Sequence, residues 1–265
     1  MDEKKINIVI FGVSTGIGKY LFNEFKKLKI NVIGFSSKKN DHKDILFYKY
    51  NYTKNIKKTF INLKKKKLNT AIIICNGTNG KVGRLENLNL NDFKKSFDIN
   101  FFSVLEIIHT YLNSFKNIKK KIIVFSGGGA FNPFVKFDSY ATSKVALVRL
   151  VENLAYEYKK ELQINAIAPG FNFTNIHRKL LKSNSKLQIG ENYYKFLLKN
   201  QKKKHTFADI IEFLKLIFFS KTYNLSGKTI SINFDNWNDK IFKKNIKKIN
   251  SSDYLTLRRI NKKPY

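Results

Sequence analysis

A glycine-rich turn between an apolar segment and an amphipathic segment constrains the fold of this chain more than any other feature. The apolar run INIVIF occupies residues 6–11, and the turn GVSTGIG follows at 12–18. The apolar side chains after the turn recur at the spacing that covers one face of a helix, at Ile17, Leu21, Phe25 and Leu28. Glycines in such a turn let the backbone approach a pyrophosphate, whose charge is met by the helix N-terminus. This arrangement predicts the start of a dinucleotide-binding α/β fold, and the alternative is a tight turn without a ligand.

The rest of the chain alternates between apolar runs, typical of buried strands, and amphipathic runs, typical of helices. Strands are expected at 6–11, 31–35, 45–50, 71–74, 122–126, 164–168 and 229–234. Helices are expected after the first turn and at 54–68, 91–115, 139–161 and 208–219. This alternation predicts an α/β fold with a doubly wound parallel seven-stranded sheet and helices on both faces, a Rossmann fold.

The chain shows no linker and no internal repeat, so a single domain is expected over residues 1–234. Residues 171–205 are polar, rich in lysine and weakly periodic, which is typical of a loop or lid over a site. Residues 235–265 contain Trp237 and a basic stretch that ends in Arg258 and Arg259, and we expect them to form a basic C-terminal extension.

The formal net charge of +32 arises from 51 Lys and Arg against 19 Asp and Glu. Nucleic acid, an anionic membrane or acidic substrates would all fit such a charge. Only five of the basic residues are arginines, however, and the lysines are spread over the whole length, which indicates a coding bias. No specific nucleic-acid partner is therefore expected.

The sequence contains no apolar run of about 18 residues, so no membrane span is expected. The first residues lack the apolar region of a signal peptide, so a cytoplasmic location is expected. The single cysteine, Cys75, excludes an internal disulfide and a cysteine-rich metal site, and no metal is expected.

A second constraint lies between residues 122 and 144. The apolar run IIVF ends at Ser126, a glycine-rich loop follows, and Tyr140 and Lys144 share one face of the next expected helix. An ammonium group beside a phenol favours the phenolate, so Lys144 is expected to lower the pKa of Tyr140. Such a tyrosine can pass a proton to or from a substrate oxygen. The alternative is a surface tyrosine beside a solvated lysine.

The end of the second expected strand bears on the choice of cofactor. The segment Ser36-Ser37-Lys38-Lys39 carries hydroxyls and cations, and no carboxylate occurs before Asp41. A carboxylate at this position would bind the ribose 2′-hydroxyl of NAD, whereas hydroxyls and a cation suit the 2′-phosphate of NADP. NADP is therefore predicted, with NAD as the alternative.

Asn100 is a polar residue within the apolar stripe of the expected helix 91–115. A polar group on a buried face needs a hydrogen-bond partner. Asn100 is therefore either a satisfied core asparagine or a residue of a functional site.

In order and context, these motifs resemble the short-chain dehydrogenase/reductase family over roughly residues 5–234. The residues that carry the resemblance are Gly12, Gly16, Ile17, Gly18, Asn100, Ser126, Tyr140, Lys144, 165–170 and Thr174. The resemblance implies an oxidoreductase that transfers a hydride between NADP(H) and an alcohol or carbonyl substrate. It also implies assembly into a homodimer or homotetramer through the two long helices.

The resemblance assigns a role to each matching residue. Tyr140 would be the general acid in carbonyl reduction, and Lys144 would bind the nicotinamide ribose and lower the pKa of Tyr140. Ser126 would hydrogen-bond the reacting oxygen, and Asn100 would hold a water that connects Lys144 to solvent. The backbone after Pro169 and the hydroxyl of Thr174 would hold the carboxamide. The implied cofactor-binding residues are Gly12, Ser14, Thr15, Gly16, Ile17, Gly18, Ser36, Ser37, Lys38, Asn51, Tyr52, Asn76, Gly77, Tyr140, Lys144, Pro169, Gly170 and Thr174.

Several positions depart from the family pattern. Phe11 stands where a threonine is common, Asn51 where an aspartate is common, and Thr15 where NADP-preferring members often carry a basic residue. The family usually has its serine thirteen residues before the tyrosine, which here is Gly127, whereas Ser126 is fourteen residues before it. Either a loop insertion restores Ser126 to the role or the role is vacant.

The spacing of Ser126 and the altered turn Ile74-Cys75-Asn76-Gly77 after the fourth expected strand keep a second hypothesis open, a cofactor-binding sensor or partner-binding module without hydride chemistry. The expected lid is basic and would suit an anionic substrate such as a nucleotide-linked sugar, although the lysine content of the whole chain explains it equally well. The basic residues of this lid are Arg178, Lys179, Lys182, Lys186, Lys202, Lys203 and Lys204. Apolar contacts between subunits, or core contacts, are expected from Phe101, Phe102, Val148 and Leu150.

Overall fold

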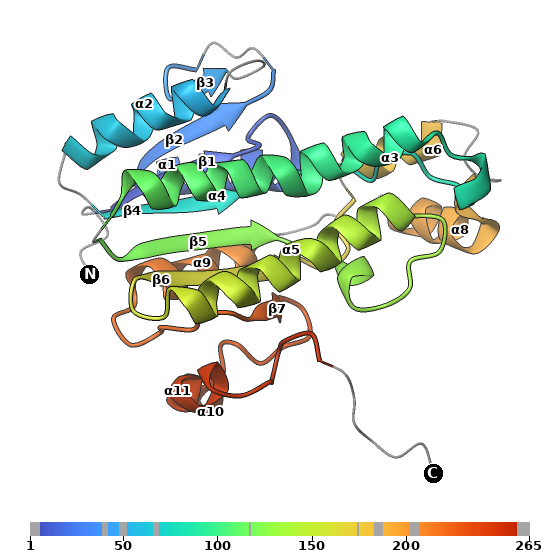
Figure 1. Ribbon diagram of the computed structural model, residues 1–265. Coiled ribbons are helices and arrows are strands. Elements are labelled where there is room, and N and C mark those ends of the chain that lie inside the picture. The colour runs from blue at the N-terminus through green and yellow to red at the C-terminus, as the bar shows by residue number, and fades with distance from the viewer. Residues whose placement is uncertain are drawn as a thin grey trace.

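The computed structural model describes residues 6–38, 42–47, 52–65, 69–116, 118–173, 175–182, 188–201 and 207–258. Within these ranges, seven parallel strands form one sheet in the order β3-β2-β1-β4-β5-β6-β7 (Figure 1). The strands are β1 (Ile6–Phe11), β2 (Asn31–Ser36), β3 (Ile45–Phe47), β4 (Asn69–Ile74), β5 (Lys120–Phe125), β6 (Leu162–Ala168) and β7 (Thr229–Ser231). The predicted doubly wound Rossmann fold is confirmed.

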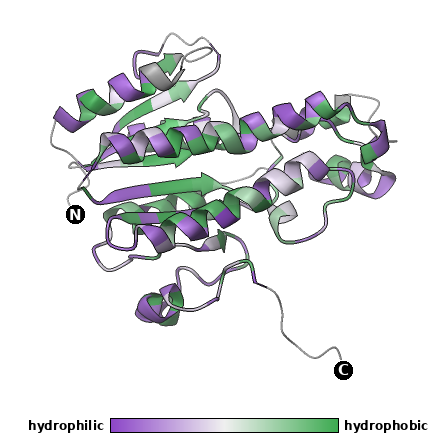
Figure 2. Cartoon of the chain, viewed as in Figure 1, coloured by the Kyte–Doolittle hydropathy of each residue, from purple (hydrophilic) through white to green (hydrophobic). Residues whose placement is uncertain are grey.

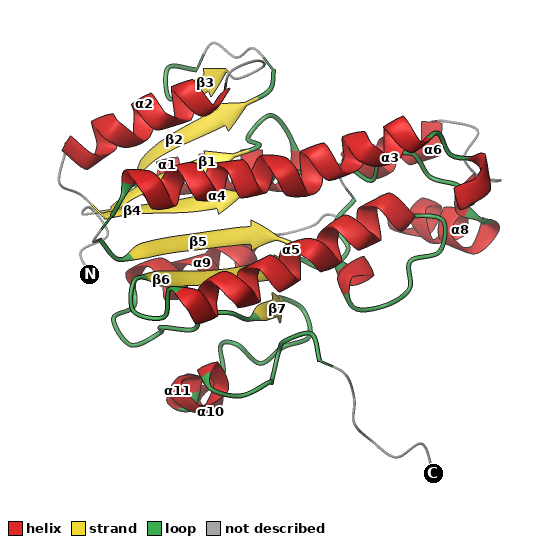
Figure 3. Ribbon diagram, in the orientation of Figure 1, coloured by secondary structure: helices red, strands yellow, loops and turns green. Residues whose placement is uncertain are grey.

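Helices cover both faces of the sheet (Figure 3). Helices α1 (Gly16–Lys27) and α9 (Ala208–Phe219) pack on one face, and α2 (Tyr52–Lys65), α4 (Ser103–Ser114) and α5 (Asp138–Glu157) pack on the other. Successive residues of a strand point to opposite faces, so each strand feeds both cores. Strands buried on both faces must be apolar throughout, which explains their largely hydrophobic colour in Figure 2.

Shorter elements lie between and beyond these layers. The segment 171–205, expected as a loop or lid, carries two helices in its described part, and they lie beyond the carboxyl ends of the strands (Figure 1). The remaining elements are the helices α3 (Leu90–Phe97), α6 (Asn175–Lys182), α8 (Glu191–Asn200), α10 (Lys240–Lys244) and α11 (Ile246–Asn250), the 3₁₀ turns Leu85–Asn87 and Gly128–Ala130, and the π-helical turn Asp98–Phe102. No helix of the described ranges is both long and apolar enough to cross a membrane.

The expected long helix 91–115 is interrupted. It consists of α3, the π-helical turn Asp98–Phe102 and α4 in direct succession. The π-helical turn contains Asn100, whose side chain is fully buried. Single π turns inside helices occur frequently at functional sites.

Two expected boundaries are wrong because turns close earlier than the apolar pattern indicates. The expected strand 229–234 ends at Ser231, because the backbone N–H groups of Phe234 and Asp235 both donate to the Ser231 carbonyl. The expected helix 139–161 ends at Glu157, and a turn around the Tyr158 carbonyl leads directly into β6. Of the expected strand 45–50, residues 48–50 lie outside the described ranges.

The chain after β7 packs against the same sheet. Trp237 and Ile249 are buried in the core that α9 covers. Leu255 accepts a hydrogen bond at its carbonyl from the Thr229 N–H, at 3.0 Å. A sheet edge with unpaired backbone groups is prone to unwanted strand pairing, and this contact covers part of the β7 edge. The predicted domain boundary at residue 234 stays a prediction.

Candidate active site

A cavity of about 1580 Å³ opens at the carboxyl ends of the strands. It includes the point between β1 and β4 where the strand order reverses, which is where open α/β sheets bind ligands. Most of the residues predicted from the sequence line it together. They are Gly12, Ser14, Thr15, Gly16, Ile17, Gly18, Ser37, Lys38, Asn76, Gly77, Ser126, Tyr140, Lys144, Pro169 and Gly170.

The glycine turn after β1 forms a backbone cradle at one end of this cavity. A Cβ atom on Gly18 would lie 2.4 Å from the carbonyl oxygen of Gly12, so only glycine permits this close packing of turn and helix. Helix α1 begins at Gly16, and its first turn contains no acidic residue that would offset its positive end. The cradle therefore fits the pyrophosphate of a dinucleotide.

Tyr140 and Lys144 project into the cavity from the first turns of α5. Lys144 is 3% exposed, and its Nζ atom donates to the carbonyl oxygen of Phe125 at 2.7 Å. This bond holds the lysine at the carboxyl end of β5, and its Nζ atom lies 6.0 Å from the centroid of the Tyr140 ring. Burial lowers the pKa of Lys144 to about 8.

The expectation that Lys144 lowers the pKa of Tyr140 is wrong for this structure. Burial raises the pKa of Tyr140 to about 12, because the phenolate is disfavoured where water is excluded. The ammonium group of Lys144 bonds to the Phe125 carbonyl, and burial is the cause of the raised pKa of Tyr140.

The loop after β5 decides where a serine can act. A Cβ atom on Gly127 would lie 2.2 Å from the hydroxyl oxygen of Tyr140, so the phenol packs directly on the Gly127 backbone. A side chain at the position thirteen residues before the tyrosine would therefore displace the Tyr140 hydroxyl. Ser126, one residue earlier, lines the cavity, and its buried Oγ atom has no hydrogen-bond partner within the described ranges.

Asn100 is satisfied by neighbours rather than directed into the cavity. Its Oδ1 atom accepts from the Thr78 N–H at 2.8 Å, and its Nδ2 atom donates to the Thr78 carbonyl at 2.9 Å and to the Ser143 hydroxyl at 3.0 Å. A Cβ atom on Gly77 would lie 3.7 Å from Lys144 Nζ and 3.8 Å from Asn100 Oδ1. Asn100 therefore holds the loop after β4 close to Lys144, and its role toward water stays a prediction.

The loop after β2 places only part of the predicted cofactor segment in the cavity. The hydroxyl of Ser36 is buried, donating to the Lys38 carbonyl at 2.8 Å and accepting from the Lys38 N–H at 3.0 Å. This local turn engages Ser36 and leaves Ser37 and Lys38 to line the cavity. Outside the described residues lie Lys39, Asp41, Asn51, the side chain of Tyr52, and Thr174.

An aromatic wall was not expected from the sequence. Phe134 follows β5, Phe171 follows β6 and Tyr193 belongs to α8, and all three line the cavity. The Phe134 and Tyr193 rings meet edge to face at 5.5 Å between centroids. His177 and Arg178 of α6 line the same region. The lysine-rich composition of 171–205 obscured Phe171 and Tyr193, although the aromatic spacing in α8 is typical of a helix.

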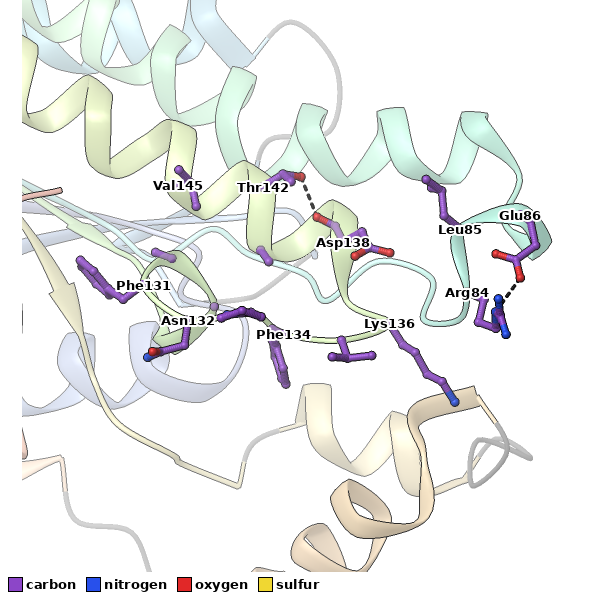
Figure 4. Close-up of a pocket in the computed structure, with 15 residues that line it drawn as sticks. Arg84, Leu85, Glu86, Phe131, Asn132, Phe134, Lys136, Asp138, Thr142 and Val145 are labelled. Carbon is purple, nitrogen blue, oxygen red and sulfur yellow. Dashed lines mark hydrogen bonds and ion pairs between the residues drawn. The ribbon is translucent and has the colours of Figure 1, made fainter. Parts of the chain in front are cut away.

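A separate groove of about 570 Å³ lies beside the cavity and shares the loop 129–134 with it (Figure 4). At its rim, Arg84 forms an ion pair with Glu86. Tyr140 and Lys144 do not line this groove, so the larger cavity is the candidate active site. Of the residues expected at subunit or core contacts, Val148 is buried and Phe102 is exposed.

A family model described as short chain dehydrogenase matches residues 6–185 of the chain. An uncharacterised oxidoreductase of Schizosaccharomyces pombe is 26% identical over 162 residues, which are 60% of this chain and 65% of that protein. The match thus spans slightly less than two thirds of that relative's length.

Two solved structures have the same fold. A short-chain dehydrogenase/reductase of Saccharomyces cerevisiae has a TM-score of 0.74 at 20% identity, with 89% of this chain and 97% of that chain covered. The structure of ElxO with NADP bound has a TM-score of 0.70 at 22% identity, with 86% and 97% covered.

Proposed function

The chain belongs to the short-chain dehydrogenase family, and we propose that it transfers a hydride between NADP(H) and an alcohol or carbonyl substrate. The observation that supports this most is that one cavity joins the glycine cradle after β1 to the Tyr140 and Lys144 side chains. A cofactor bound along the cradle and a substrate oxygen beside Tyr140 would share that cavity.

The residues of the chain then have separate tasks. Bound NADPH supplies the hydride for the carbonyl carbon. Tyr140 donates its phenolic proton to the carbonyl oxygen as that oxygen gains charge. Because burial raises its pKa to about 12, the phenol is protonated at neutral pH and ready to act as the acid. The Lys144 ammonium group stabilises the phenolate that proton transfer leaves.

Ser126 is proposed to hydrogen-bond the reacting oxygen. Its buried hydroxyl has no partner within the described ranges, so bonding to a substrate would satisfy a polar group that is otherwise left unpaired. Gly127 has no side chain for the task, and its backbone packs on the Tyr140 hydroxyl.

NADP is proposed as the cofactor because Ser37 and Lys38 line the cavity at the end of β2. An ammonium and a hydroxyl there complement a 2′-phosphate. An NADP-bound structure of ElxO, which has the same fold, is consistent with this choice. NAD remains the alternative.

An anionic substrate, such as a nucleotide-linked sugar, is proposed on the basis of the Arg178 guanidinium of α6. The side chains of Arg178 and His177 line the cavity together with the aromatic wall. We also propose a cytoplasmic homodimer or homotetramer, which gel filtration with light scattering would test.

Replacement of Tyr140 by phenylalanine tests the proposed function. Tyr140→Phe removes the proton donor and should lower kcat by about 10²–10⁴-fold in NADPH-dependent reduction across a panel of carbonyls and nucleotide-linked sugars. NADPH binding, followed by nucleotide fluorescence, should be unchanged. Tyr156→Phe on the same helix is the matched control, since Tyr156 is 74% exposed.

The competing hypothesis is a cofactor-binding sensor without hydride chemistry. Its motive is the empty position at Gly127. Tight NADPH binding together with no turnover of any panel member would favour the sensor. Equal turnover by Tyr140→Phe and the unmodified protein would reject the catalytic role of Tyr140.

A further inference from the structure

One end of the cavity is formed by β7 and the chain that returns to it from the C-terminal tail. We call this end the tail chamber and define it by its lining residues Thr229, Ser231, Asp235, Leu255 and Thr256. The hydrogen bond from the Thr229 N–H to the Leu255 carbonyl fixes the tail beside the strand. The tail is therefore a wall of the same cavity that contains Tyr140.

The tail chamber holds polar atoms that lack partners. Thr229 is 4% exposed, and within the described ranges its Oγ1 atom makes no hydrogen bond. Asp235 is half-buried, and its Oδ2 atom accepts from the Ser231 N–H at 2.7 Å. The described residues offer no partner to its Oδ1 atom. A buried polar group without a partner, such as the Thr229 hydroxyl, is rare in folded proteins and points to a ligand. Asp235 adds a carboxylate oxygen that is open to the same ligand.

The charges along the cavity differ between its ends. The cations Lys38 and Arg178 line the parts near β2 and α6, whereas the carboxylate of Asp235 lines the tail chamber; a further carboxylate, that of Asp98, lines the cavity at the π-helical turn. A carboxylate accepts hydrogen bonds and repels an anion, so the group bound beside it should be a donor without negative charge. A hydroxyl group meets this requirement and can also accept from the Thr229 hydroxyl.

We propose that the tail chamber binds the hydroxyl groups of a sugar or polyol whose reacting carbon lies beside Tyr140. This inference rests on the proposed hydride transfer for the position of the reacting carbon, but the binding itself does not depend on turnover. Asp235 accepts from one or two substrate hydroxyls. The Thr229 hydroxyl reaches the ligand by a rotation about χ1, which breaks no existing hydrogen bond.

Binding of neutral sugars to the full chain with NADPH present tests the tail chamber. Dissociation constants for D-glucose and D-sorbitol are measured by saturation-transfer NMR for the unmodified protein, Thr229→Val, Thr229→Ser and Asp235→Asn. The valine and asparagine variants each lose a hydrogen bond, so their dissociation constants should rise about tenfold. Thr229→Ser keeps the hydroxyl and should bind the sugars as the unmodified protein does.

Thr59→Val and Asp209→Asn, both absent from the cavity lining, are the matched controls. Thermal unfolding verifies that every variant is folded.

Three outcomes would overturn the inference. The first is that neither sugar binds the unmodified protein, and the second is that Thr229→Val and Asp235→Asn bind the sugars as the unmodified protein does. The third uses ethanolamine as an added probe: if Asp235→Asn weakens the binding of ethanolamine and leaves sugar binding unchanged, the site binds an ammonium group. Reduction of glucose by NADPH is followed in parallel. Sugar binding that the variants weaken, in a protein that reduces no carbonyl, would reject the hydride transfer and support the tail chamber.

Discussion

The hydroxyl of Tyr140 lies in close contact with the backbone of Gly127. A methyl group on Gly127 would lie 2.2 Å from the phenolic oxygen, whereas a methyl group on the adjacent Gly128 would meet nothing within 4 Å. Side chains that act in proton transfer depend on position to within a fraction of an ångström. Gly127 therefore contributes to the site because its missing side chain leaves room for the Tyr140 hydroxyl.

Gly127→Ala should displace the Tyr140 hydroxyl and lower kcat by about 10²-fold, because misplacement by about 1 Å costs this much in rate. Gly128→Ala is the matched control and should retain activity. The measurement is kcat for carbonyl reduction, with circular dichroism melting to confirm folding. Full activity in Gly127→Ala would contradict the close contact.

Burial of the charged Lys144 ammonium group lowers the free energy of unfolding by an amount that depends on pH. Its pKa is about 8 in the folded protein against an ordinary value of 10.5, so the folded state disfavours its proton. The penalty is fully present below pH 8 and is relieved as the pH rises from 8 to 10.5. With about 1.4 kcal/mol per pKa unit, the total is about 3 kcal/mol.

Lys144→Met removes this titration while keeping most of the side-chain volume. The free energy of unfolding of the unmodified protein should therefore rise by about 3 kcal/mol relative to that of Lys144→Met between pH 8 and 10.5. Urea unfolding at several pH values measures the difference. The lost bond to the Phe125 carbonyl lowers the stability of the variant at every pH and leaves this slope unaffected. A flat difference would show that the pKa of Lys144 is the same in the folded and unfolded protein.

At the scale of elements, the loop between β2 and β3 controls the proposed cofactor preference. The hydroxyl of Ser36 is engaged in the loop's own turn, which presents Ser37 and Lys38 to the cavity. A local hydrogen-bonded turn thus selects which members of the segment are available to a nucleotide.

Lys38→Ala should raise KM for NADPH about tenfold and leave KM for NADH nearly unchanged, because only NADPH carries the 2′-phosphate that the ammonium would bind. Lys19→Ala, in helix α1 and absent from the cavity lining, is the control for the loss of one positive charge. Equal effects on both cofactors would contradict a 2′-phosphate contact at Lys38.

At the scale of the whole molecule, the tail is tied to helix α5 by a buried carboxylate. Glu152 accepts from the Leu257 N–H at 2.7 Å, from Arg149 at 2.5 Å and from Arg258 at 2.9 Å. Its side chain is largely buried, whereas both arginines are partly exposed. One residue therefore joins segments that are far apart in the sequence.

Glu152→Ala should lower the free energy of unfolding by about 2 kcal/mol, because it removes the acceptor of the partly buried Leu257 N–H and one of the acceptors of each arginine. The released tail should also become more sensitive to limited proteolysis. Glu157→Ala, at the exposed end of α5, is the matched control. Urea unfolding measures the free energy of unfolding, and a time course of protease digestion measures the sensitivity of the tail. Equal stability of the two variants would show that the tail is held by its other contacts alone.

The architecture could be predicted from the amino-acid sequence, because the relevant signals are local. Apolar runs, the glycine turn at 12–18 and the Tyr140–Lys144 spacing each depend on residues a few positions apart, and all lie where they were expected. The ends of β7 and α5 were missed, since turns around Ser231 and Tyr158 close before the apolar pattern does.

The chemistry of the site, in contrast, depends on contacts that form only in the folded chain. The pKa of Tyr140 depends on how deeply the folded chain buries its hydroxyl. The helical spacing between Tyr140 and Lys144 does not reveal that burial. The fit of its hydroxyl against Gly127, the aromatic wall and the tail chamber likewise arise where segments distant in the chain meet. Burial and close contact arise from the packing of these distant segments, so they cannot be predicted from residues that are neighbours in the sequence.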